Sequence, residues 1–223
     1  TIGNSLVQDN GTGVLIGSGP IYLKFNVQET SANRVAILYR GTQGADASMV
    51  TAFGTPYLSI GGQENLVNSI QTIGFGFTNG TSYIQPAEIG FQTTSTIGYT
   101  KGDLVFATRG DTTNTAPTKR MTLDSSGNLG LGVTPSAWSP TLAKAIQVGN
   151  LGSSIWSYTT SNTSTPYTFI DNNAYYDGTN NIYIVNNRGA ARYQQVNNEH
   201  RWEVAPSGTA GAAITFTQAM TLT

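Results

Sequence analysis

The chain has 223 residues, of which only 10% are charged, and its formal net charge is −1. A chain so close to neutrality has no charge excess to attract nucleic acid or an anionic membrane surface, so neither partner is expected. Cysteine is absent, which excludes disulfides, thiolate metal sites and cysteine nucleophiles. The longest uncharged stretch, 145–170, is too rich in Ser, Thr and Asn to insert into a membrane.

Taken in chain order, short period-two segments rich in β-branched and aromatic residues predict β-strands, and no window repeats apolar residues at helical spacing. The strands are expected at 21–27, 35–39, 104–107, 182–185 and 214–217. Turns that contain glycine separate them, such as Asp177-Gly178, and these turns favour hairpins. The sequence therefore predicts an all-β fold.

Two segments, 73–77 and 129–132, alternate bulky residues with glycine. One face of each strand then carries large side chains and the other carries none. Glycine in a strand usually marks a bend or a close approach of another backbone. This pattern fits a barrel corner or a sandwich edge. It also fits a fibre in which three chains wrap a common axis and bury their bulky residues against one another, and the low charge and abundant Thr and Asn favour the fibre.

The chain contains weak internal sequence repeats, which we call echoes. At one constant offset, residues 105–111 and 118–124 align with 204–210 and 217–223, and at a second offset residues 9–17 align with 124–132. These echoes predict the end of a fibre repeat at 1–17, a β-rich domain at 18–133 and a second β-rich domain at 134–223. The alignment also predicts that Met121 and Met220 lie at equivalent, buried positions.

The run RMTLDSSGNLGLGV at 120–133 resembles the linker sequences of bacteriophage tail fibres and tailspikes. The segments 134–138, 144–149, 173–180, 193–195 and 205–211 are similar to the same class of phage fibre, so the resemblance covers about 103 to 223. It implies short-stranded repeated units, β-prism or β-sandwich-like, in an intertwined homotrimeric fibre. In that family such a region lies in the shaft, or just before a C-terminal intramolecular chaperone of the endosialidase type.

The resemblance implies a structural virion protein that is made in the bacterial host cytoplasm and is no enzyme. Its expected partners are two further copies of the chain, other tail or fibre proteins of the virion, and a glycan or protein of the host surface. Two alternatives remain open. One is a tailspike depolymerase fragment that cleaves surface polysaccharide, and the other is a shaft or head fibre without a receptor site.

Candidate catalytic and metal-binding groups do not converge. In a strand, His200 would share a face with Trp202, while Glu199, Arg201 and Glu203 would lie on the opposite face. The acidic residues near Asp171 and Asp177 lack the ligand spacing and the bidentate glutamate of a calcium loop. No helix follows the glycines at 127–132 to bind a phosphate. We therefore expect no catalytic residue, no metal and no cofactor.

The stretch 156–202 combines many aromatic residues with asparagines, which are the side chains that bind sugars through ring faces and amide groups. A turn at Asp177-Gly178 would present its neighbours at a loop tip, where function is concentrated. Receptor contacts are therefore expected at Trp156, Tyr175, Tyr176, Asn180 and Asn181. The alternative is that the aromatic residues fill the core and the asparagines occupy turns.

Overall fold

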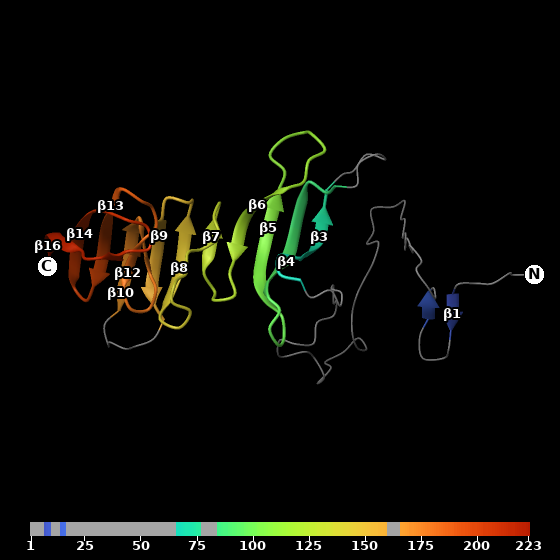
Figure 1. Ribbon diagram of the computed structural model, residues 1–223, viewed down its shortest axis with the longest axis horizontal. Coiled ribbons are helices and arrows are strands. Elements are labelled where there is room, and N and C mark those ends of the chain that lie inside the picture. Colours follow the sequence, from blue (N-terminus) through green and yellow to red (C-terminus); the bar gives the residue numbers. More distant parts are fainter. Residues whose placement is uncertain (1–6, 10–13, 17–65, 77–83, 160–165) are drawn as a thin grey trace, which may run out of the picture. The chain divides into compact units, whose positions relative to one another are not determined.

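A computed structural model describes residues 7–9, 14–16, 66–76, 84–159 and 166–223 (Figure 1). The chain divides into two compact units, Thr1–Ser59 and Ile60–Thr223. In the first unit, β1 (Val7–Asp9) and β2 (Val14–Ile16) form an antiparallel hairpin. All regular elements in the described ranges are strands, so the predicted all-β class is confirmed there. The strands expected at 21–27 and 35–39 lie outside the described residues.

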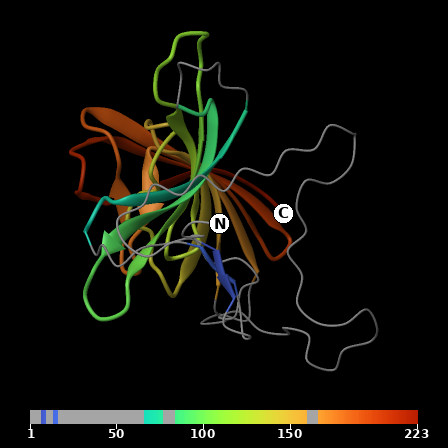
Figure 2. The ribbon, with the colours of Figure 1, turned by 90° about the vertical axis from the view of Figure 1, so that its right-hand side faces the viewer.

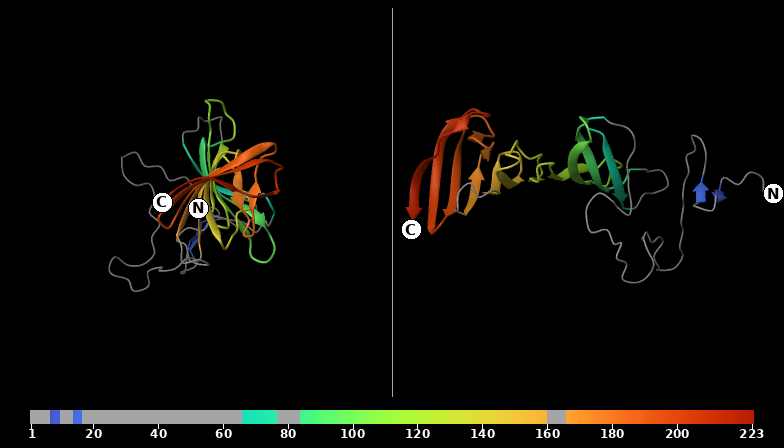
Figure 3. Two further views of the ribbon diagram at one scale, coloured as in Figure 1. Left: turned by 90° about the vertical axis from the view of Figure 1, so that its left-hand side faces the viewer. Right: turned by 90° about the horizontal axis from the view of Figure 1, so that it is seen from below.

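The second unit contains one large sheet whose strands follow almost in chain order (Figures 1 and 3). Viewed along the row of strands, the strand direction turns progressively, as twisted sheets do (Figure 2). All pairs are antiparallel except β7 with β8. The strands are β3 (Ile70–Phe75), β4 (Ala87–Ser95), β5 (Lys101–Thr108), β6 (Thr118–Leu123), β7 (Leu129–Leu131), β8 (Ala143–Val148), β9 (Ser153–Tyr158), β10 (Tyr167–Asn172), β13 (Arg188–Val196), β14 (Glu199–Gly208) and β16 (Thr217–Leu222).

A small second sheet accompanies the C-terminal part of the large one. It consists of β11 (Ala174–Tyr176), β12 (Asn181–Tyr183) and β15 (Ala213–Ile214), with β12 in the middle. The predicted turn at Asp177-Gly178 is present, and it joins β11 to β12. The strand expected at 182–185 ends early, at Tyr183, and the one expected at 214–217 is divided between β15 and β16.

The parallel pair β7–β8 requires a connection that crosses the sheet, and residues 132–142 make it. The amide oxygen of Gln147, on β8, accepts hydrogen bonds from the backbone of Ser136 at 2.9 Å and from the indole of Trp138 at 3.2 Å. A Cβ on Gly130 would lie 2.2 Å from the carbonyl oxygen of Val133. The expectation that this strand glycine marks a close backbone approach is therefore confirmed.

The two faces of the large sheet differ in an unusual way. One cross-strand row takes one residue from each strand between β4 and β16, and it defines what we call the open face. Its members are Phe91, Leu104, Leu123, Leu129, Ile146, Ile155, Ile170, Tyr193, Trp202 and Met220. A second row on the open face is Ile73, Ile89, Phe106, Met121, Leu131 and Val148. These two rows of the open face are thus apolar throughout.

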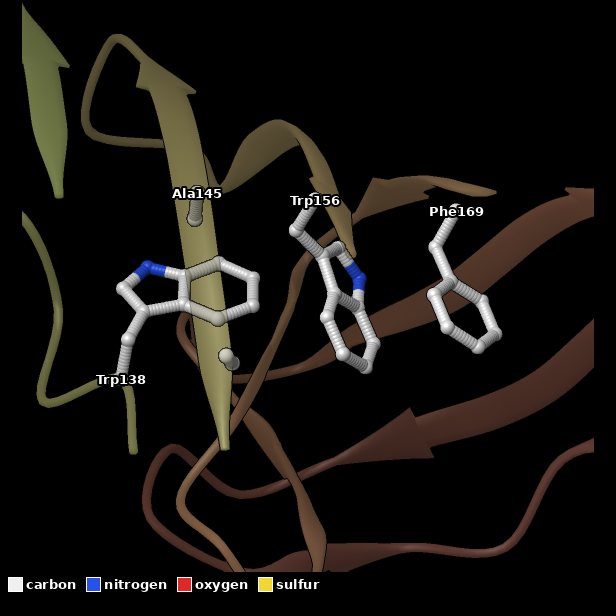
Figure 4. Close-up of a cluster of buried hydrophobic side chains, with 5 residues drawn as sticks. Trp138, Ala145, Trp156 and Phe169 are labelled. Atoms are coloured by element: carbon white, nitrogen blue, oxygen red, sulfur yellow. The ribbon is translucent and has the colours of Figure 1, made fainter. Parts of the chain in front are cut away.

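The opposite face, which we call the covered face, carries both polar and apolar side chains, and its centre is buried. Its middle row consists of Gly90, Val105, Thr122, Gly130, Gln147, Ser154, Asp171 and Arg192, all of them buried. Beside it, Trp138, Ala143, Ala145, Trp156 and Phe169 form a core cluster (Figure 4). A second cluster joins the small sheet to β13 and β14 through Ala174, Tyr183, Ala190, Ala205 and Ile214.

The predicted burial of Met121 and Met220 is wrong, and the register of β16 differs from the one that the repeat alignment implies. Met121 pairs with Phe106, so the repeat alignment places Met220 opposite Ala205, but Met220 pairs with Trp202, three positions away on β14. Neither methionine is buried: Met121 is half-buried and Met220 is 53% exposed. The small sheet explains the shift. Ala205 faces the core that Tyr183 fills, and this packing fixes the orientation of β14.

The domain boundary expected between 133 and 134 falls in the crossing connection between β7 and β8, inside one continuous sheet. It therefore coincides with the parallel pair of that sheet. The division into 1–17, 18–133 and 134–223 stays a prediction. The echo between 9–17 and 124–132 corresponds to two hairpins, β1–β2 and β6–β7, whose connections differ in length.

Candidate functional site

The residues expected to contact a receptor lie in two different environments. Trp156 projects from β9 into the covered face, where it is 2% exposed. Its ring stacks on Phe169 with centroids 4.1 Å apart, and its indole donates a hydrogen bond to Asp171 at 2.8 Å. The expectation that Trp156 stands at an accessible tip is wrong. It is a core residue, because alternation along β9 directs Trp156 inward and Ile155 to the open face.

The other expected residues surround the β11–β12 turn. Asn180 is exposed, whereas Tyr175 and Tyr176 are half-buried. Tyr175 packs edge-on against Trp138, and Tyr176 stacks on Trp156. These two tyrosines therefore help to hold the turn against the core, and a receptor contact by Tyr175, Tyr176 or Asn180 stays a prediction.

Asp177 shapes this turn through its carboxylate, which accepts hydrogen bonds from the backbone N–H groups of Thr179 and Asn180, both at 2.7 Å. These bonds favour the ionised carboxylate and lower the pKa of Asp177. At the start of β12, the Asn181 side chain accepts a hydrogen bond from Arg192 at 2.7 Å, so it points away from the turn and toward the large sheet.

A cavity of about 420 Å³ lies on the covered face, between the large sheet and the small sheet. Its aromatic lining comes from Tyr158, Tyr167, Phe169, Tyr176 and Phe216. Its polar lining comes from Asn181, Arg192, Gln194, Arg201 and Glu203. We call this cavity the aromatic pocket. Among the residues expected to bind a receptor, it includes Tyr176 and Asn181.

Electrostatics in the aromatic pocket are dominated by the ion pair of Arg192 with Asp171. The guanidinium donates to both carboxylate oxygens, at 2.8 and 2.7 Å, and both side chains are buried. The same guanidinium lies over the rings of Phe169 and Phe216, 4.7 and 4.4 Å from their centroids. Burial also raises the pKa of Tyr158, which keeps its hydroxyl neutral.

Sequence reasoning missed Arg192, Gln194 and Phe216. Arg192 and Gln194 lie two positions apart on β13, a strand that was not predicted because AARYQQ contains no β-branched residue. If a strand had been predicted there, the alternation of side chains along a strand would have placed Arg192 and Gln194 on the same face. Phe216 lies between β15 and β16, in a segment predicted as a single strand, so its packing against Arg192 had no signal in the sequence.

The open face carries a second candidate surface. A shallow groove of about 560 Å³ runs over β8, β9, β10, β13 and β14, and it is lined mainly by Ile146, Val148, Ile155, Ile170, Tyr193 and Val204. Ile155 is 52% exposed, and Ile146, Val148, Ile170 and Val204 are exposed as well. Contiguous apolar surface of this kind marks an interaction site.

His200 is placed as the strand pattern predicts, on the face that also carries Trp202. Its ring stacks on that of Tyr193 and its Nδ1 is hydrogen-bonded to the Tyr193 hydroxyl. Glu199 pairs instead with Arg201 on the other face. Within the described residues, no group of three or more acidic or histidine side chains could hold a metal ion.

No helix long and apolar enough to cross a membrane occurs in the part of the chain that the structure describes. Comparison of the chain with protein-family models, with curated proteins and with solved structures finds no match.

Proposed function

We propose that this chain is a structural segment of a bacteriophage tail fibre, which forms a homotrimer and attaches the virion to the host surface without enzymatic activity. The observation that carries the proposal is the open face, a continuous apolar surface that spans the sheet from β4 to β16. The two apolar rows are exposed or half-buried, whereas the polar residues Gln147, Asp171 and Arg192 of the opposite face are buried.

This arrangement favours association of identical chains. Burying a whole Ile or Leu side chain contributes roughly 1.5–3 kcal/mol, and many side chains of the open face are still exposed in the single chain. A second copy presents the same rows, so isologous or cyclic packing covers them all at once. The low charge of the chain means that no strong repulsion opposes close packing of copies.

The number of chains and the virion context come from the resemblance of 120–133 to phage tail-fibre linkers. These residues form the β6–β7 hairpin, with Leu123, Leu129 and Leu131 on the open face. These bulky residues support the proposal, because a trimer could bury them on the open face. Gly130, on the opposite face, lies against the chain's own backbone at Val133. Other tail or fibre proteins of the virion are the proposed neighbours, and a host glycan or protein is the proposed receptor.

Ile155→Lys tests the assembly, because it places a charge in the middle of the open face. We expect the unchanged chain to sediment as a trimer and the Ile155→Lys chain to lose at least tenfold in association constant, since a charge buried without a partner is strongly unfavourable. Thr112→Lys is the matched control, because Thr112 is exposed in the β5–β6 connection. A folded monomer of the unchanged chain, or an Ile155→Lys trimer of undiminished stability, would contradict the proposal.

The attachment function has its own test. We expect the purified trimer to bind host cells and to release no reducing ends from their surface polysaccharide. Steady release of reducing ends would favour the alternative, a tailspike depolymerase. A trimer that neither binds nor cleaves would favour a shaft or head fibre without a receptor site.

A further inference from the structure

The aromatic pocket has the size and composition of a small-molecule site. Its volume of about 420 Å³ lies within the range of about 300–1,000 Å³ typical of ligand pockets, which combine apolar walls with a few convergent polar groups. Its walls come from elements that are distant in sequence, since Phe169 belongs to β10 and Phe216 follows β15. Its shape is therefore set by the packing of the two sheets and not by a single loop.

Tyr158 offers the exposed ring of this pocket. It stands nearly perpendicular to the rings of Trp156, Phe169 and Tyr176, with centroid distances of 5.2, 5.6 and 5.5 Å. These contacts hold the ring in place, yet the residue remains 39% exposed. An aromatic ring that is fixed by its neighbours and still accessible is a platform on which an apolar C–H surface can pack.

The polar side of the pocket supplies hydrogen-bonding groups at fixed positions. Gln194 is buried, and its amide reaches Glu203 only through a long contact of 3.5 Å, so both side chains retain hydrogen-bonding capacity. Arg192 is already held by Asp171 and Asn181. The carboxylate of Glu203 accepts hydrogen bonds, and the Gln194 amide both donates and accepts them.

Charge selects among possible ligands. Arg192 is neutralised by Asp171, and Arg201 by Glu199, whereas Glu203 forms no ion pair among the described residues. The pocket therefore carries a surplus carboxylate, which disfavours carboxylated, sulfated or phosphorylated ligands. It favours an uncharged molecule with hydroxyl donors on one side and a C–H face on the other.

From these features we infer that the aromatic pocket binds a neutral saccharide unit, with its C–H face against Tyr158 and its hydroxyls on Gln194 and Glu203. The inference rests on the proposed attachment function for its biological role, because it names the receptor chemistry. The pocket lies on the covered face, opposite the open face, so covering the apolar rows in a trimer leaves it accessible.

The test uses the full chain and four probes: the methyl glycosides of glucose, galactose and N-acetylglucosamine, and methyl glucuronide. Saturation-transfer NMR and titration of the aromatic resonances should show that at least one neutral glycoside binds and shifts the Tyr158 ring protons. The glucuronide should bind at least tenfold more weakly. Failure of all three neutral glycosides to bind, or preference for the glucuronide, would overturn the inference.

Tyr158→Ala should weaken binding of the neutral glycoside at least tenfold, and Glu203→Gln severalfold. Tyr99→Ala is the matched control, because Tyr99 is fully exposed in the β4–β5 connection. Should Tyr158→Ala fail to fold, the ring-proton shifts of the unchanged chain and the Glu203→Gln titration still decide the question. Sedimentation of each sample separates the two proposals, since a trimer that binds no glycoside contradicts only the pocket, whereas a glycoside-binding monomer contradicts only the fibre.

Discussion

The ion pair of Asp171 and Arg192 is the residue-scale feature on which the C-terminal part of the covered face depends. Side-chain exposures of 0% for Asp171 and 6% for Arg192 leave both charges almost without water. Such a pair adds little net stability compared with apolar packing, but a single charge left behind is costly. The two hydrogen bonds from Arg192 and the one from the Trp156 indole satisfy most of the hydrogen-bonding capacity of the Asp171 carboxylate.

Arg192→Leu should therefore lower the free energy of unfolding by about 3–5 kcal/mol, because it leaves the Asp171 carboxylate buried without its cation. The measurement is denaturant unfolding at a fixed protein concentration. Arg188→Leu, at the exposed start of β13, is the control and should change stability little. The pair Asp171→Leu with Arg192→Leu should lose much less than Arg192→Leu alone, and an equal loss would contradict the argument.

At the scale of residues, the sequence predicted the position of a turn more reliably than the exposure of individual side chains. Asp177-Gly178 was identified correctly because an Asp carboxylate and a following glycine have local, sequence-encoded reasons to form a turn. The exposure of Trp156 depends instead on which face of β9 is covered, and residues far along the chain decide that. The pocket residue Arg192 was missed for the same reason, since its partner Asp171 lies on another strand.

At the scale of elements, Asn173 connects the two sheets. It follows β10 directly, has φ near 58°, and is buried. Its side-chain oxygen accepts hydrogen bonds from the backbone of Ile184 and Val185, and its amide nitrogen donates to the carbonyls of Val185, Arg188 and Gly189. One side chain thus fixes the path of the chain between β12 and β13.

Asn173→Gly keeps the left-handed backbone accessible but removes all of these bonds, so we expect it to lower the unfolding free energy by about 2–4 kcal/mol. Asn173→Ala should lose roughly 1 kcal/mol more, because alanine is strained at positive φ. Asn187→Gly serves as the control, since Asn187 also has positive φ but is exposed. Equal effects at 173 and 187 would show that the backbone and not the side chain matters.

Element prediction succeeded where the signal was local. The short segment 104–107, rich in bulky apolar residues, predicted β5, and the glycine at 130 correctly indicated a close backbone approach. The repeat alignment failed to predict the register of β16. That register depends on which residues of β14 face the core, and the packing of Ala205 against the small sheet decides this.

At the scale of the whole molecule, the near-zero net charge predicts how the proposed attachment responds to ionic strength. With a net charge of −1 and only 10% charged residues, long-range attraction contributes little to encounter with a surface. Recognition should depend on ring stacking and hydrogen bonds. We expect host-cell binding to change less than about twofold between about 50 and about 500 mM salt. A loss of tenfold or more would show that charge steers attachment.

The fold class could be predicted from composition and strand alternation, because both act within a few residues. The exposure of the apolar rows on one face of the large sheet, and the burial of the opposite face, could not be predicted. Alternation assigns the residues of one strand to two faces, as with Ile155 and Trp156, but it does not say which face the rest of the chain covers. The crossing connection 132–142 and the small sheet decide that, and both are tertiary features.

The open face also has a consequence for the time between synthesis and assembly. If copies associate as we propose, each newly made chain first displays its apolar rows to other proteins, and exposed apolar surface of this kind leads to aggregation when partners are scarce. Association with other copies therefore competes with aggregation, and the fraction of chains that assemble depends on the chain concentration. The yield of usable protein becomes a question of kinetics, governed by chain concentration during synthesis more than by the stability of any one fold.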